Sequence, residues 1–131
     1  MVWHPMEPRR AEDLTARTFQ FACDVYDYCN DLTEFPGLAR RIAWQLFDAA
    51  GSVGANREEA KAAYSPREFT AKNAIVLKEC REANFWLRLA ESKSLGTPDK
   101  RARLLRESDE LIAIFTAGQK RLQSRHTRLQ T

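Results

Sequence analysis

Histidine is scarce in this sequence, and its scarcity removes the common catalytic arrangements. The only two histidines, His4 and His126, lie near the ends of the chain. Catalytic triads, Cys/His pairs and Glu-x-x-His di-iron motifs all need a histidine on a packed element. The sequence therefore predicts no enzymatic activity, no metal site and no cofactor.

Glycine and proline are also few, with five of each in 131 residues. An all-β fold needs many turn residues, whereas long helices need few. No apolar run approaches the roughly 20 residues that cross a bilayer, and the N-terminal residues lack the apolar core of a secretion signal. We expect a single all-α domain in the cytoplasm, without membrane contact.

The cysteines do not form a recognisable disulfide or zinc pattern. Cys23, Cys29 and Cys80 are odd in number, include no C-x-x-C pair and lie within helical apolar patterns. We expect all three to be buried, reduced thiols that pack as small hydrophobic residues.

What the sequence has in abundance is helical periodicity, with apolar residues recurring every three or four positions. We expect an N-terminal flexible arm over residues 1–12, a bundle over 13–125 and a C-terminal tail over 126–131. Short connections between helices of similar length favour an antiparallel up-down-up-down four-helix bundle. The predicted helices cover about 13–32, 38–63, 66–94 and 98–123.

Two boundaries carry explicit signals. Ser65 can cap a helix, Pro66 suits the first helical position, and Glu68 can complete a capping box. The segment 95–98, Leu-Gly-Thr-Pro, supplies a glycine stop followed by a capping threonine and a proline at the next helix start.

The first helix is apolar over two adjoining stripes. One contains Phe19, Ala22, Cys23, Tyr26 and Cys29, and the other contains Phe21, Val25, Tyr28 and Leu32. This is wider than one core contact needs. The additional stripe is covered either by another subunit or by a broad contact within the monomer.

The second helix contains two glycines, Gly51 and Gly54, each of which costs about 1 kcal/mol relative to alanine. We interpret them as allowing close approach of a neighbouring helix. A local kink is the alternative, and a phosphate-binding loop is the least favoured interpretation because the P-loop pattern is absent.

Several polar residues fall on or near the apolar seams. We interpret them as a structural network in which Lys72 pairs with a carboxylate across helices. The alternative is a carboxylate pair tuned for acid-base chemistry. The set is Gln45, Asn56, Glu59, Lys72, Asn73, Glu79 and Glu82.

The formal net charge is only +3, but residues 98–131 hold eight basic and four acidic side chains. A basic run of this kind attracts polyanions, although it is also typical of a solvated tail. The candidate phosphate contacts are Arg103, Arg106, Lys120, Arg121, Arg125 and Arg128.

Two segments resemble a known family. Residues 45–59 fit the pattern Q-L-x-x-S/A-x-x-S-I/V-x-A-N-x-x-E. Residues 65–72 fit S-x-x-D/E-F-x-x-K, and residues 78–87 fit K-E-x-x-E-x-x-x-W-L. With these motifs the chain resembles the bacterial 23S rRNA intervening sequence proteins.

The resemblance implies an antiparallel four-helix bundle without enzymatic activity that assembles, in known members, as a ring of five subunits. That family is similar to the accessory protein of diversity-generating retroelements, a pentameric bundle with a basic surface that binds nucleic acid and a reverse transcriptase. The resemblance thus makes a homopentamer that binds RNA or DNA the expected function. A protein-interaction or scaffold module without nucleic-acid binding is the alternative.

Overall fold

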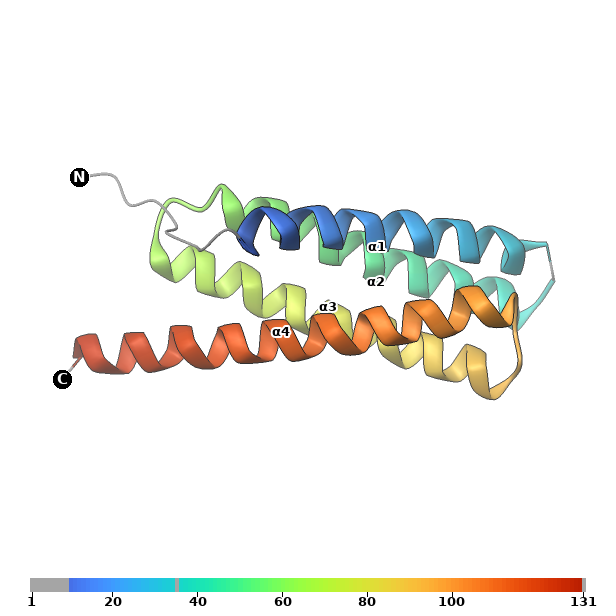
Figure 1. Ribbon diagram of the computed structural model, residues 1–131. Coiled ribbons are helices and arrows are strands. Elements are labelled where there is room, and N and C mark those ends of the chain that lie inside the picture. Colours follow the sequence, from blue (N-terminus) through green and yellow to red (C-terminus); the bar gives the residue numbers. More distant parts are fainter. Residues whose placement is uncertain (1–9, 35, 131) are drawn as a thin grey trace.

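The computed structural model describes the backbone of residues 10–34 and 36–130, and the side chains of residues 14–34 and 36–125. Within these ranges the chain forms four α-helices and no strand, which confirms the predicted all-α class. Figure 1 shows that consecutive helices run in opposite directions. The helices are α1 (Arg10–Thr33), α2 (Leu38–Lys61), α3 (Pro66–Ser92) and α4 (Pro98–Gln130).

The helices pack mainly on their neighbours in the chain, α1 on α2, α2 on α3 and α3 on α4. The contact between α1 and α4 is less extensive and closes the bundle, while α1 and α3 lie on a diagonal and do not touch through their backbones. Two ion pairs join α1 to α4: Arg17 pairs with Glu107, and Lys100 Nζ lies 3.2 Å from Asp31 Oδ2. None of the helices in the described ranges is long and apolar enough to cross a membrane.

The helix ends differ from the prediction at both ends of the described chain. Helix α1 begins at Arg10, so residues 10–12 of the expected arm are helical, and α4 continues to Gln130 through the expected tail. The reason is the local composition, because residues 119–130 contain no glycine or proline and are rich in helix formers such as Lys, Arg, Gln and Leu. The rest of the arm, residues 1–9, and Thr131 lie outside the described residues.

The capping box at the start of α3 is formed as predicted. The Ser65 hydroxyl accepts a hydrogen bond from the Glu68 backbone N–H at 3.1 Å. Glu68 Oε2 in turn accepts from the backbone N–H of Tyr64 at 2.9 Å. These bonds satisfy donors that a helix N-terminus otherwise leaves unpaired, and they fix where α3 begins.

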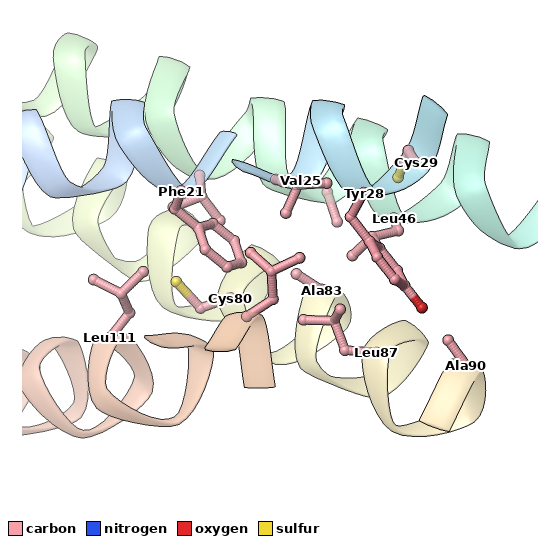
Figure 2. Packing of buried hydrophobic residues seen from close by; sticks show 14 of the residues in the cluster. Phe21, Val25, Tyr28, Cys29, Leu46, Cys80, Ala83, Leu87, Ala90 and Leu111 are labelled. Atoms are coloured by element: carbon pink, nitrogen blue, oxygen red, sulfur yellow. The ribbon is translucent and has the colours of Figure 1, made fainter. Parts of the chain in front are cut away.

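A main apolar core runs along the bundle, and a smaller cluster of Ala60, Ala63 and Phe69 lies where α2 ends and α3 begins. Figure 2 shows Phe21, Val25 and Tyr28 of α1 pointing toward the α3 side chains around Cys80 and Leu87. On α3, one seam of residues at alternating spacings of four and three is buried throughout: Phe69, Asn73, Val76, Cys80, Ala83, Leu87 and Ala90. A large apolar side chain in such a seam stabilises the fold by about 1.5–3 kcal/mol through removal from water.

The two stripes of α1 have different environments. Phe21, Val25, Tyr28 and Leu32 are fully buried, whereas Phe19 and Tyr26 remain 55% and 53% exposed. Contacts within the monomer therefore bury Cys29 of the first stripe but leave its Phe19 and Tyr26 uncovered.

The expectation that all three cysteines are buried is wrong for Cys23. Cys23 lies on the exposed stripe, in line with Phe19 and Tyr26, and is itself exposed. Cys29 and Cys80 are buried and reduced, and loss of hydration raises the pKa of each thiol to about 12. Both are therefore uncharged packing residues at neutral pH, and the Cys29 thiol donates to the Ala43 carbonyl at 3.3 Å.

The two mid-helix glycines have different roles. A β-carbon at Gly54 would lie 3.4 Å from the Thr18 carbonyl oxygen, so α1 and α2 approach closely there, as the interpretation required. A β-carbon at Gly51 would meet nothing within 4 Å. Within one subunit, Gly51 therefore has no packing reason to be glycine.

Candidate functional site

The polar residues near the seams form separate local contacts instead of one network. Lys72 Nζ lies 3.1 Å from Glu59 Oε1 and links α3 to α2, and both side chains are partly exposed. Asn56 donates within its own helix to the Ser52 carbonyl and hydroxyl oxygens. Gln45 is exposed, because its position on α2 is rotated away from the buried residues Leu46 and Ala49.

The carboxylates Glu79 and Glu82 lie one turn apart on α3. Loss of hydration, with the nearby Glu82 charge adding to it, raises the pKa of Glu79 above its usual range. Glu82 is exposed. Among the described residues no three His, Cys, Asp or Glu side chains lie close enough to hold a metal ion.

The buried polar centre of the bundle is Arg57, which sequence reasoning missed. Its side chain is 2% exposed, and Nη1 donates to Asn73 Oδ1 at 2.9 Å. The guanidinium lies 6.0 Å from the Phe69 ring centre and 5.8 Å from that of Phe115. Arg57 thereby joins α2 to both α3 and α4.

A second buried polar contact joins α3 to α4. Asn84 Nδ2 donates to the Ser108 hydroxyl at 2.8 Å and to Asp109 Oδ1 at 3.0 Å, and Asn84 Oδ1 accepts from Arg88 Nε at 2.9 Å. Arg57 and Asn84 each lie three or four positions from other buried residues in their helices. This spacing is the sequence signal from which their burial could have been predicted. Both contacts set helix register and offer no reactive group to a substrate.

The predicted basic residues of α4 fall into two groups. Arg103 and Arg106 are exposed and line a surface hollow of about 480 Å³ together with Asp99 and Ala102. Lys120, Arg121 and Arg125 are exposed farther along the helix. None of these five side chains forms an ion pair within the described part of the chain.

The structure does not bring the two groups together. About 21 Å of helix separates Arg106 from Lys120 at 1.5 Å per residue, and the exposed Asp109 and Glu110 lie between them. The second group has no acidic neighbour in sequence, because residues 111–131 contain no Asp or Glu. The side chain of Arg128 lies outside the described residues.

A third surface is apolar and lies where α1 meets α2. Phe19 and Tyr26 of α1 and Trp44 of α2 are all more than half exposed, with Trp44 at 60%. Tyr26 contacts Phe47 of α2 edge-to-face, with ring centres 5.9 Å apart. We call this surface the α1–α2 face, and its members are Phe19, Cys23, Tyr26, Trp44, Phe47 and Gly51.

Comparison with known proteins identifies the relatives of this bundle. Residues 12–117 match the family model described as 23S rRNA-intervening sequence protein. The chain belongs to this family. No curated protein matches the chain.

A solved structure resembles this member of the 23S rRNA-intervening sequence family. It comes from Bacteroides thetaiotaomicron and is described as a protein with unknown function from the S23 ribosomal protein family. The match has a TM-score of 0.73 at 24% sequence identity and covers 82% of this chain and 98% of that chain. At this identity the likeness shows a shared fold. The family match ends at residue 117, so it does not reach Lys120, Arg121 or Arg125.

Proposed function

We propose that this 23S rRNA-intervening sequence protein is a non-enzymatic, cytoplasmic, homopentameric up-down-up-down bundle that binds nucleic acid through phosphate contacts. The observation that carries nucleic-acid binding is the group Lys120, Arg121 and Arg125. These three side chains are exposed, free of ion pairs within the described residues and followed by no acid. They lie near the end of α4, which Figure 1 shows extending past the other helices.

The chemistry of this group suits phosphates better than bases. Lysine and arginine on an exposed helix face neutralise phosphates and release condensed counterions, which gives affinity without sequence information. Between this group and Arg106, the exposed Asp109 carboxylate and the Glu110 carboxylate, which pairs with Arg17, interrupt the basic surface along α4. We therefore assign the main contact to the C-terminal group and a secondary one to Arg103 and Arg106.

The first test measures binding of a labelled RNA hairpin and a DNA duplex by fluorescence anisotropy across a salt series. Replacing Lys120, Arg121 and Arg125 together by glutamine should weaken binding at least tenfold at low salt. The slope of log affinity against log salt concentration is negative, and it should become less steep by about 3, roughly one unit for each phosphate that is no longer neutralised.

The control removes the same charge elsewhere. Arg40, Arg41 and Lys93 are exposed at the start of α2 and just after α3, at the opposite end of the bundle from Lys120, and replacing them by glutamine should leave the salt slope unchanged. Absence of binding at low ionic strength, or an equal loss of affinity in both triple variants, would contradict the proposed contact surface.

The proposed homo-oligomer rests on the α1–α2 face. Several large apolar side chains exposed on two adjacent helices of a bundle are typical of a subunit interface. Light scattering should give a mass about five times the 15.1 kDa of one chain, and nuclease treatment should not change it. A mass equal to one chain after nuclease treatment would refute the oligomer.

A protein-interaction module is the second candidate, and the same α1–α2 face favours it. A similarity to retroelement accessory proteins would combine the two functions, because such proteins bind nucleic acid and a reverse transcriptase. A one-chain mass together with no nucleic-acid binding would favour the protein-interaction function.

A further inference from the structure

A second exposed apolar surface lies on α3. Phe85 is 48% exposed and Ile75 is 37% exposed, although α3 already buries a full seam against the core. Phe85 contacts Trp86 edge-to-face at 5.0 Å between ring centres, and Arg88 lies over the Phe85 ring at 5.9 Å. We call this surface the α3 face, and its members are Ile75, Lys78, Arg81, Phe85 and Arg88.

The two apolar surfaces lie on different parts of the subunit. Helix α1 does not contact α3 through its backbone, and Phe47 of the α1–α2 face lies on the side of α2 toward α1, where it contacts Tyr26. The exposed residues Ile75 and Phe85 point away from the core that Val76 and Leu87 enter. One neighbouring molecule can therefore occupy the α1–α2 face while another occupies the α3 face.

The surfaces carry opposite charge. Residues 18–34 and 42–56, which contain the α1–α2 face, include no Lys or Arg, and their exposed acids include Asp24, Asp27 and Asp48. On the α3 face, the exposed Lys78, Arg81 and Arg88 outnumber the exposed Glu82. Lys78 and Arg81 form no ion pair within the described residues.

We propose that the α1–α2 face of one copy binds the α3 face of the next copy. This inference rests on the proposed homo-oligomer and specifies its interface. Contact between two identical α1–α2 faces would bring Asp27 and Asp48 of both copies together, whereas the head-to-tail contact brings acidic and basic rims together. A contact between unlike faces is heterologous, which is the kind of contact that the proposed ring of five copies requires.

Gly51 provides an independent argument for a neighbour on the α1–α2 face. A glycine within a helix is destabilising, and a β-carbon at Gly51 would meet no atom of its own subunit within 4 Å. Gly51 lies one helical turn beyond Phe47 on the same side of α2, so the missing side chain leaves open space beside that ring. An aromatic side chain of the next copy, such as Phe85, would occupy this space.

The test uses two variants, each with one surface disabled. The first combines Phe19→Asp and Tyr26→Asp, and the second combines Ile75→Asp and Phe85→Asp. All four side chains are partly exposed, so circular dichroism should show native helix content in both. Each variant alone should have the mass of one chain in light scattering, because the mutated surface blocks every junction between its own copies.

Mixing the two variants is the decisive measurement. Each retains the surface that the other lacks, so the mixture should form a one-to-one dimer of about twice the 15.1 kDa chain mass and nothing larger. An unchanged wild-type mass for the Ile75/Phe85 variant, or a mixture that stays at one chain mass, would overturn the proposed interface. A wild-type protein of one chain mass would instead refute the homo-oligomer itself.

Charge reversal provides a second measurement if an aspartate variant fails to fold. Replacing Asp27 and Asp48 by lysine, or Lys78 and Arg81 by glutamate, should each lower the assembled fraction at least tenfold at low salt. Combining all four reversals in one chain restores opposite charges and should restore assembly. A four-residue variant that remains dissociated would contradict the proposed pairing.

Discussion

Replacing Gly96 by alanine is expected to lower the free energy of unfolding by about 2–5 kcal/mol. Gly96 has a φ of +69°, and its added β-carbon would lie 2.8 Å from Tyr28 Cε1 and 3.0 Å from Leu32 Cδ2. The left-handed conformation costs an L-residue about 1–2 kcal/mol, and overpacking costs about 1–3 kcal/mol. Tyr28 cannot easily move aside, because it is buried and its hydroxyl donates to the Leu95 carbonyl at 2.7 Å. Urea denaturation followed by circular dichroism measures the loss of stability.

Gly51→Ala is the matched control, because the same substitution there meets open space. It should raise the free energy of unfolding by up to about 1 kcal/mol through helix propensity. Both glycine variants are best made with Phe19→Asp and Tyr26→Asp, which remove any contribution from assembly. Equal losses of stability at Gly96 and Gly51 would contradict the role assigned to the turn between α3 and α4.

Helix α3 shows how far sequence reasoning reaches in this protein. Its capping residues predicted its start at Pro66, and its buried seam follows a strict spacing of three and four residues. Both signals are local, since each depends on residues within two turns of one another. Such features need no knowledge of which helix lies opposite.

Features that depend on the side chains of a neighbouring helix were harder to predict. Asn56 and Arg57 are adjacent, so their side chains differ in direction by about 100° around α2. The buried seam of α2 could include either residue. Uncharged asparagine is the less polar of the two, so Asn56 was predicted to lie on the seam, whereas the structure buries Arg57. The arginine fits there because Phe69 and Phe115 come from α3 and α4, and their positions are absent from the α2 sequence.

The candidate functional surfaces show the same difference between features that depend on local sequence and features that depend on a neighbouring element. Exposure of Lys120, Arg121 and Arg125 follows from their local pattern, and so does their separation from Arg106. The second stripe on α1 could not be assigned from the sequence, because hydrophobicity alone does not say which molecule covers it. The packed subunit leaves Phe19 and Tyr26 exposed, and that observation turns an open alternative into an interface that can be tested.

The buried guanidinium of Arg57 leads to the second large prediction. Replacing Arg57 by alanine should lower the free energy of unfolding by about 3–5 kcal/mol. The change removes packing against two aromatic rings and leaves the buried Asn73 amide oxygen without this donor. A domain of this size has a total stability of about 5–15 kcal/mol, so the variant should be close to unfolding at physiological temperature.

A double-mutant cycle separates the hydrogen bond from the packing. Arg57→Met keeps most of the side-chain volume, and Asn73→Leu replaces the amide by an apolar group of similar shape. Each single variant removes the bond at 2.9 Å and leaves its buried partner without this interaction, whereas the double variant removes both polar groups at once. The double variant should therefore be about 1–3 kcal/mol more stable than the sum of the single effects predicts. Strictly additive effects in urea denaturation would show that Arg57 and Asn73 are not energetically coupled.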